Sequence, residues 1–142
     1  MSNLSAEITL QWAGGEYPFA LKAKQIEGLE HDCGEGIGRI CMRVFSATEY
    51  HFKHLQRTIF WGLIGGGMSA TEAAHMVRQH VDGVPIDPLG DPSSTLKTAS
   101  AVLKAVHFGW ETLPPSGEAE GRETRPSEQT SGSTAPRSSA TE

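Results

Sequence analysis

Cysteines, concentrated positive charge and long apolar runs are all scarce in this sequence. Its 142 residues include only two cysteines, Cys33 and Cys41, too few for a disulfide framework, so we expect free thiols in a reducing compartment. Lysine and arginine together number 12 against 17 aspartates and glutamates, which gives a net charge of −5, and no basic run occurs. Because binding to a nucleic-acid backbone requires a concentrated positive surface, nucleic acid is not expected as a direct partner.

The sequence also lacks the segments that place a protein in or across a membrane. A membrane-spanning helix needs about 18–20 consecutive apolar residues, whereas the longest apolar candidate, residues 58–68, is short and interrupted by glycines. The first seven residues have neither the basic start nor the apolar stretch of a secretory signal. These features predict a soluble, cytoplasmic protein.

Apolar residues are too few for the whole chain to form one compact core. They make up 37% of the sequence, below the roughly 45–50% of a globular domain, and the deficit is concentrated at the C-terminal end. Residues 113–142 are rich in Ser, Thr, Pro, Glu and Gly, with Leu113 as the only large apolar side chain. Such a segment cannot offset an ordering entropy of about 1–2 kcal/mol per residue. The sequence therefore predicts one domain, residues 1–112, and a disordered tail, residues 113–142.

Two kinds of apolar periodicity occur in the predicted domain. Apolar and polar residues alternate over residues 7–12 and 17–21 on either side of a glycine turn, which is typical of a β-hairpin. An isolated hairpin is only marginally stable, so its apolar face must pack on other elements. Three- and four-residue apolar spacing predicts helices over residues 23–33, 37–45, 50–64, 70–81 and 93–108. The predicted fold class is α+β, an N-terminal β-hairpin packed on a small bundle of about five α-helices.

Glycine-rich and cysteine–histidine segments resemble ligand sites only superficially. The glycine-rich residues 34–38 lie between predicted helices, and Glu35 would repel a phosphate, so we interpret them as a turn. The possible zinc ligands lack metal-site spacing, and we interpret them as buried thiols and surface imidazoles. These residues are His31, Cys33, Cys41, His51 and His54.

The sequence offers no recognisable catalytic group either. It contains no Gly-x-Ser-x-Gly or comparable frame for nucleophilic catalysis. Glu27 and Glu30 form a carboxylate pair, but their three-residue spacing is more typical of a solvated helix face. Ser69 and Glu72 have the Ser-x-x-Glu form of a capping box at the start of the fourth helix. We therefore predict no catalytic, cofactor or metal site.

Several segments occur in the order and spacing of a known family. They comprise residues 7–10, 17–21, 26–30, 36–38, 61–69, 72–73, 81–85, 101–103 and 108–109. In these segments the chain resembles the gene transfer agent family of small phage tail proteins, which are described as tail assembly chaperones or as tail tube proteins. The likeness covers roughly residues 5–110 and leaves out the tail.

The resemblance implies a non-enzymatic protein made by a prophage or a gene transfer agent cluster. Its implied partners are the tape-measure protein and tail tube subunits, and a homo-oligomer is left open. The residues that we expect to bind a partner are Trp61, Leu63, Ile64 and Met68, where an apolar run meets a glycine loop. The alternative is that these residues only pack the third helix on the fourth.

Three functional classes are compatible with these patterns to different degrees. A tail assembly chaperone, acting in the host cytoplasm, is our first hypothesis. The second is a structural tail tube subunit, which would be found in the virion but generally needs enough strands to form a continuous β-ring. A regulator or small enzyme would need a pocket with converging polar groups, and the sequence shows none.

Overall fold

The computed structural model describes residues 4–111, and its elements follow the predicted order. Helix bounds differ from the predicted ones by at most two residues, and the α+β class is confirmed. The predicted tail, residues 113–142, lies outside the described residues. The elements are β1 (Leu4–Ser5), β2 (Glu7–Trp12), β3 (Gly15–Ala20), α1 (Ala23–Cys33), α2 (Ile37–Ser46), α3 (Phe52–Gly65), α4 (Ala70–His80), α5 (Thr95–Phe108) and β4 (Trp110–Glu111).

Strands β2 and β3 form the predicted antiparallel hairpin. Their register pairs Ile8 with Phe19 and closes at Trp12 opposite Gly15. The two turn residues between the strands, Ala13 and Gly14, have φ angles of 52° and 80°. A two-residue turn with positive φ at both positions matches the right-handed twist of the strands, and glycine adopts this conformation without steric cost.

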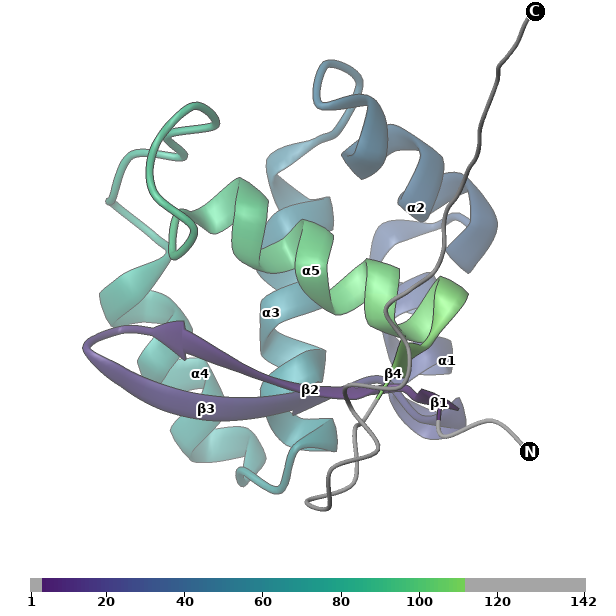
Figure 1. Cartoon of the computed structure of the whole chain (residues 1–142), viewed down its shortest axis with the longest axis horizontal. Helices are drawn as coiled ribbons and strands as arrows, with labels where there is room; N and C mark the ends of the chain where they lie inside the picture. The colour runs from purple at the N-terminus through teal and green to yellow at the C-terminus, as the bar shows by residue number, and fades with distance from the viewer. Residues whose placement is uncertain (1–3, 112–142) are drawn as a thin grey trace, which may run out of the picture. The chain divides into compact units, whose positions relative to one another are not determined.

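Helix α3 is the central element of the fold (Figure 1). In this view α1 and α2 lie on one side of it and α4 on the other, while the hairpin and α5 also pack on it. Its side chains Leu55, Ile59 and Leu63 are at most 1% exposed. The hairpin contributes Phe19, which is fully buried, to the same core. The predicted cover for the apolar face of the hairpin is therefore provided by α3 and α5.

Contacts of two kinds complete the fold, a local cap at the start of α4 and a pairing of two short strands distant in sequence. The Oγ of Ser69 accepts a hydrogen bond from the backbone N–H of Glu72 at 3.1 Å, which is the Ser half of the predicted capping box. Strands β1 and β4 pair with each other, a contact that two-residue segments give no periodicity to predict. None of the helices that the structure describes is long and apolar enough to cross a membrane.

Candidate functional site

The four residues predicted to bind a partner do not form one exposed surface. Leu63 is 1% exposed and belongs to the core, so in this conformation it packs the helices and offers no free surface. Trp61, Ile64 and Met68 are partly buried and pack against that core. Only these three can touch a partner without a rearrangement, and their role in binding stays a prediction.

Trp61 is held in place by polar contacts between α1 and α3. Its indole Nε1 donates a hydrogen bond to Oδ2 of Asp32 at 2.9 Å, and Nε of Arg57 donates to the same oxygen at 2.9 Å. Burial opposes the ionisation of Asp32, but the hydrogen bonds from Trp61 and Arg57 and the charge of Arg57 lower its pKa overall. A Cβ on Gly28 would lie 2.5 Å from the indole ring, so α1 approaches this ring closely.

Met68 borders a small groove between the hairpin and the end of α3, which we call the Met68 groove. Its volume is about 210 Å³, below the range of most small-molecule sites, which is about 300–1,000 Å³. A groove of this size suits the side chains of a protein partner better than a cofactor. Its lining residues are Tyr17, Pro18, Leu63, Gly66, Gly67, Met68 and Glu72.

The glycine loop beside this groove is a site of close backbone packing. A Cβ on Gly65 would lie 1.8 Å from the carbonyl oxygen of Ala20, and one on Gly66 would lie 2.0 Å from that of Pro18. Gly67 has a φ of 117°, a conformation that favours glycine. The sequence predicted this run as a helix stop but gave no signal that its first two glycines lie directly on β3.

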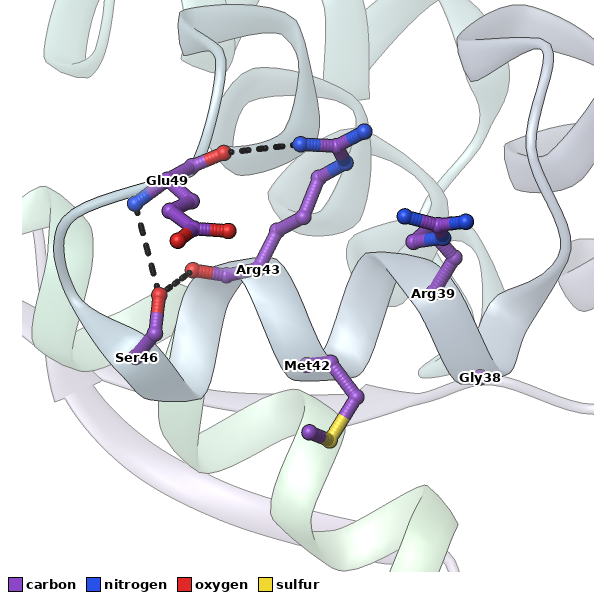
Figure 2. Close-up of a pocket in the computed structure, with 6 residues that line it drawn as sticks. All are labelled: Gly38, Arg39, Met42, Arg43, Ser46 and Glu49. Carbon is purple, nitrogen blue, oxygen red and sulfur yellow. Dashed lines mark hydrogen bonds between the residues drawn. The ribbon is translucent and has the colours of Figure 1, made fainter.

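A larger depression lies along the outer side of α2 (Figure 2), and we call it the α2 groove. It has a volume of about 570 Å³ and is lined by Gly38, Arg39, Met42, Arg43, Ser46 and Glu49. The Oγ of Ser46 donates to the carbonyl oxygen of Arg43 at 2.8 Å and accepts from the N–H of Glu49 at 3.3 Å. Arg43 donates to the carbonyl oxygen of Glu49 at 3.3 Å, so the loop after α2 is tied back to the helix.

His54 is a buried member of a polar network, not a surface imidazole. The prediction of an exposed side chain was wrong, because His54 is only 2% exposed. Its Nδ1 accepts the backbone N–H of His51 at 2.8 Å, and its Nε2 lies 3.3 Å from Oε1 of Glu35. Glu35 also pairs with Arg43 at 2.9 Å. Burial lowers the pKa of His54 despite the opposing charge of Glu35, so the neutral ring is the favoured form.

The two cysteines are inert thiols in this environment. Burial raises the pKa of Cys33 and that of Cys41 to about 11, so neither is a thiolate at neutral pH. Across residues 4–111, no three His, Cys, Asp or Glu side chains gather in a way that could hold a metal ion.

Two of the most exposed large apolar side chains were missed by the sequence reasoning. Met42 is 69% exposed and Phe108 is 64% exposed. A signal for Met42 was present, because it falls outside the apolar stripe of its helix, among Arg39, Arg43 and Ser46. Phe108 was assigned to the end of the last helix, and nothing in its local pattern indicates exposure.

One comparison with known proteins gives a match. Residues 5–109 match the model of a family described as "Phage tail tube protein, GTA-gp10". Neither the curated proteins nor the solved structures contain a match. The match spans the hairpin and all five helices.

Proposed function

Because the chain belongs to this family of phage tail proteins, we propose that it is a tail assembly chaperone, which binds the tape-measure protein and tail tube subunits before the tail is complete. Membership of the family supports a general role connected with the phage tail. The proposal is that the protein assists assembly and is not a part of the finished particle. Such a chaperone acts in the cytoplasm of the host.

The architecture of the hairpin is the observation that carries this proposal. Its two strands form a small sheet, and its apolar face is covered by α3 and α5. A tube wall in which neighbouring subunits join their strands generally needs enough strands to form a continuous β-ring, whereas residues 4–111 form two sheets of two strands each. A mainly helical domain with partly exposed apolar grooves is better suited to holding a client segment temporarily.

The Met68 groove is the surface that we assign to this binding. It is lined by Met68 and lies at the end of α3, where Ile64 directly follows the lining residue Leu63 in the sequence. In this proposal Met68 and Ile64 contact the client, while Leu63 and Trp61 keep the end of α3 in place. Methionine suits such a surface because its flexible side chain adapts to different apolar partners.

A structural tail tube subunit is the second candidate, and the description of the family favours it. In that case the protein would be retained in the finished virion in many copies. The two candidates share the expectation of contacts with other tail proteins. They differ in whether those contacts are still present in the finished particle.

Co-purification and particle analysis distinguish the two candidates. The tagged full chain is co-expressed with the neighbouring tail genes, and both the soluble complexes and the purified particles are analysed by mass spectrometry. A chaperone captures the tape-measure protein in the soluble fraction and is absent from particles. Many copies in particles without a soluble complex would establish the structural subunit instead.

A matched pair of variants tests the Met68 groove in the same assay. Met68→Glu should reduce capture of the tape-measure protein, because a carboxylate in an apolar contact must be desolvated. Leu89→Glu is the control, since Leu89 is 94% exposed on the loop between α4 and α5 and does not line the groove. Circular dichroism of both variants shows whether the fold is retained. Equal capture by the two folded variants would remove Met68 from the interface.

A further inference from the structure

A second exposed apolar surface lies where α2 meets the C-terminal part of α5. The rings of Phe45 and Phe108 stack with their centroids 6.0 Å apart. Met42 lies one helical turn before Phe45 on α2, and Figure 2 shows its side chain turned away from Arg39 and Arg43. We call the surface formed by Met42, Phe45 and Phe108 the α2–α5 patch.

The patch is accessible although its residues are large and apolar. Met42 and Phe108 are 69% and 64% exposed, and Phe45 is partly buried against the core. Isolated exposed apolar residues are ordinary, but a cluster contributed by two packed helices is typical of a binding surface. Exposed apolar side chains of this kind are also the contacts that an amphipathic partner helix makes.

The charges on the two helices that form the patch all have one sign, and Glu49 of the loop after α2 is the carboxylate that lines the α2 groove beside Met42. Helices α2 and α5 together contain Arg39, Arg43, Lys97 and Lys104 and not one Asp or Glu, although the chain as a whole has a net charge of −5. Arg43 is neutralised by Glu35 at 2.9 Å. Among residues 4–111, Arg39 and Lys104 have no carboxylate within salt-bridge distance.

These cations border the apolar residues on both helices. Nζ of Lys104 lies 6.0 Å from the centre of the Phe45 ring, and Lys104 is one turn before Phe108 on α5. Arg39 lies one turn before Met42 on α2 and also lines the α2 groove, with its side chain on the other side of the helix from that of Met42 (Figure 2). The apolar strip is thus accompanied by a positive charge from α5 and another from α2.

We propose that the α2–α5 patch binds an acidic amphipathic helix of another protein. The apolar stripe of that helix would cover Met42, Phe45 and Phe108, and acidic side chains beside the stripe would pair with Lys104 and Arg39. A second copy of this chain is a poorer occupant, because a two-fold contact would bring like charges together. The inference goes beyond the proposed function and holds for either a chaperone or a tail subunit.

The test uses two designed peptides and the full-length protein. The first peptide is a helix of about four turns with leucines along one face and glutamates on both sides of them; the second has lysine in place of every glutamate. Each is titrated into ¹⁵N-labelled protein, and affinity is measured by fluorescence anisotropy. We expect the acidic peptide to bind with shifts confined to α2 and α5, and to bind at least about tenfold more tightly than the lysine peptide. Its affinity should fall as salt rises, because exposed charges are screened.

Three variants assign the binding to the named residues. Lys104→Glu should weaken the acidic peptide about tenfold or more and strengthen the lysine peptide. The double variant Met42→Ser, Phe108→Ser should abolish binding, and Leu89→Ser, at another exposed apolar residue, should leave it unchanged. All these side chains are exposed, so the variants should remain folded, which circular dichroism verifies.

Four results of the peptide experiments would overturn the proposal. They are the absence of binding by the acidic peptide, equal binding of both peptides, wild-type affinity in the folded double variant, and shifts located outside α2 and α5. Analytical ultracentrifugation provides one further check. Self-association of the full chain that disappears in the double variant would identify the patch as an interface between copies, and would also overturn it.

Discussion

Among single residues, Gly28 and Trp61 form an especially tight contact between helices. The indole ring occupies the space that a Cβ on Gly28 would need, at 2.5 Å, whereas a Cβ on Gly38 in α2 would meet nothing within 4 Å. Both glycines lie within helices, so helix propensity favours alanine at each position by up to about 1 kcal/mol. Alanine substitutions at Gly28 and Gly38 therefore differ mainly in the space available for the added methyl group.

Gly28→Ala should lower the free energy of unfolding by about 1–3 kcal/mol, because the ring must move and its hydrogen bond to Asp32 is strained. Gly38→Ala should leave that free energy unchanged or raise it by up to about 1 kcal/mol. Urea unfolding of both variants measures the difference. If the two substitutions had the same effect, the close contact at Trp61 would not contribute to stability.

His54 should make the stability of the domain depend on pH. Its Nδ1 can accept the N–H of His51 only when the ring is neutral. Burial lowers its folded pKa below the value of about 6.5 of the unfolded chain. The unfolded state then binds more protons in this range, so stability is fully present above about pH 6.5 and is lost as the pH falls toward the folded pKa. Glu35, His51 and Arg43 face the ring, and their charges modify this titration.

His54→Gln is the matched variant for this dependence. Glutamine can accept the same backbone N–H as the third residue of a capping box, but it does not titrate. We expect the free energy of unfolding of the wild type to fall more steeply than that of the variant between about pH 7.5 and pH 5. Parallel pH profiles of the two proteins would show that another group causes the dependence.

Among the elements, α2 depends on α1 for its N-terminal cap. Its N-cap residue, Gly36, has no side chain that could accept a hydrogen bond. Oε2 of Glu30 from α1 fills this role by accepting the N–H of Ile37 at 2.8 Å. The carboxylate also lies favourably at the positive end of the α2 dipole. The sequence assigned Glu30 to a solvated face, because its partner lies in the next helix.

Glu30→Ala should lower the free energy of unfolding by about 1 kcal/mol, the usual cost of losing an N-cap. Glu30→Gln keeps an acceptor oxygen but loses the charge, so we expect a smaller loss. Glu27→Ala is the control on the same helix, because Glu27 is exposed. Thermal unfolding of the three variants ranks their stabilities. A loss of stability in Glu27→Ala as large as that in Glu30→Ala would contradict the capping role of Glu30.

For the whole molecule, the composition predicts a domain followed by a tail. The part with apolar periodicity ends near Phe108, and the family match ends at residue 109. Residues 113–142 contain one large apolar side chain, Leu113, and therefore have little surface to bury. The tail prediction concerns residues beyond those that the structure describes.

Truncation after Thr112 should shift the melting temperature by less than about 2 °C, because the removed residues contain only one large apolar side chain that could be buried. For comparison, a loss of about 1 kcal/mol in the free energy of unfolding corresponds to about 4–8 °C in a domain of this size. The full chain and the shortened chain are compared by calorimetry in the same buffer. A fall of many degrees would show that the tail packs on the domain. In that case the boundary at residue 112 would need to be moved.

The sequence alone determined the hairpin, the five helices and their order, but not the short strands β1 and β4. Apolar residues alternate in the hairpin and recur every three or four residues in the helices. Each of these patterns is contained within one segment, so it can be recognised without knowing the neighbours of that segment in space. Gly34 and Gly109 follow the last residues of α1 and α5, as expected of glycines that end helices. The order and spacing of these segments were also enough to identify the family.

The tertiary structure decided which residues of these elements are available to a partner. Leu63 has the same apolar character as Met42, yet it is 1% exposed whereas Met42 is 69% exposed. His54 is buried because a backbone N–H and Glu35 from another segment satisfy its ring. Phe108 joins Phe45 across sixty-three positions of sequence. Such contacts depend on how elements distant in sequence meet, and the periodicity of a single segment carries no information about its neighbours in space.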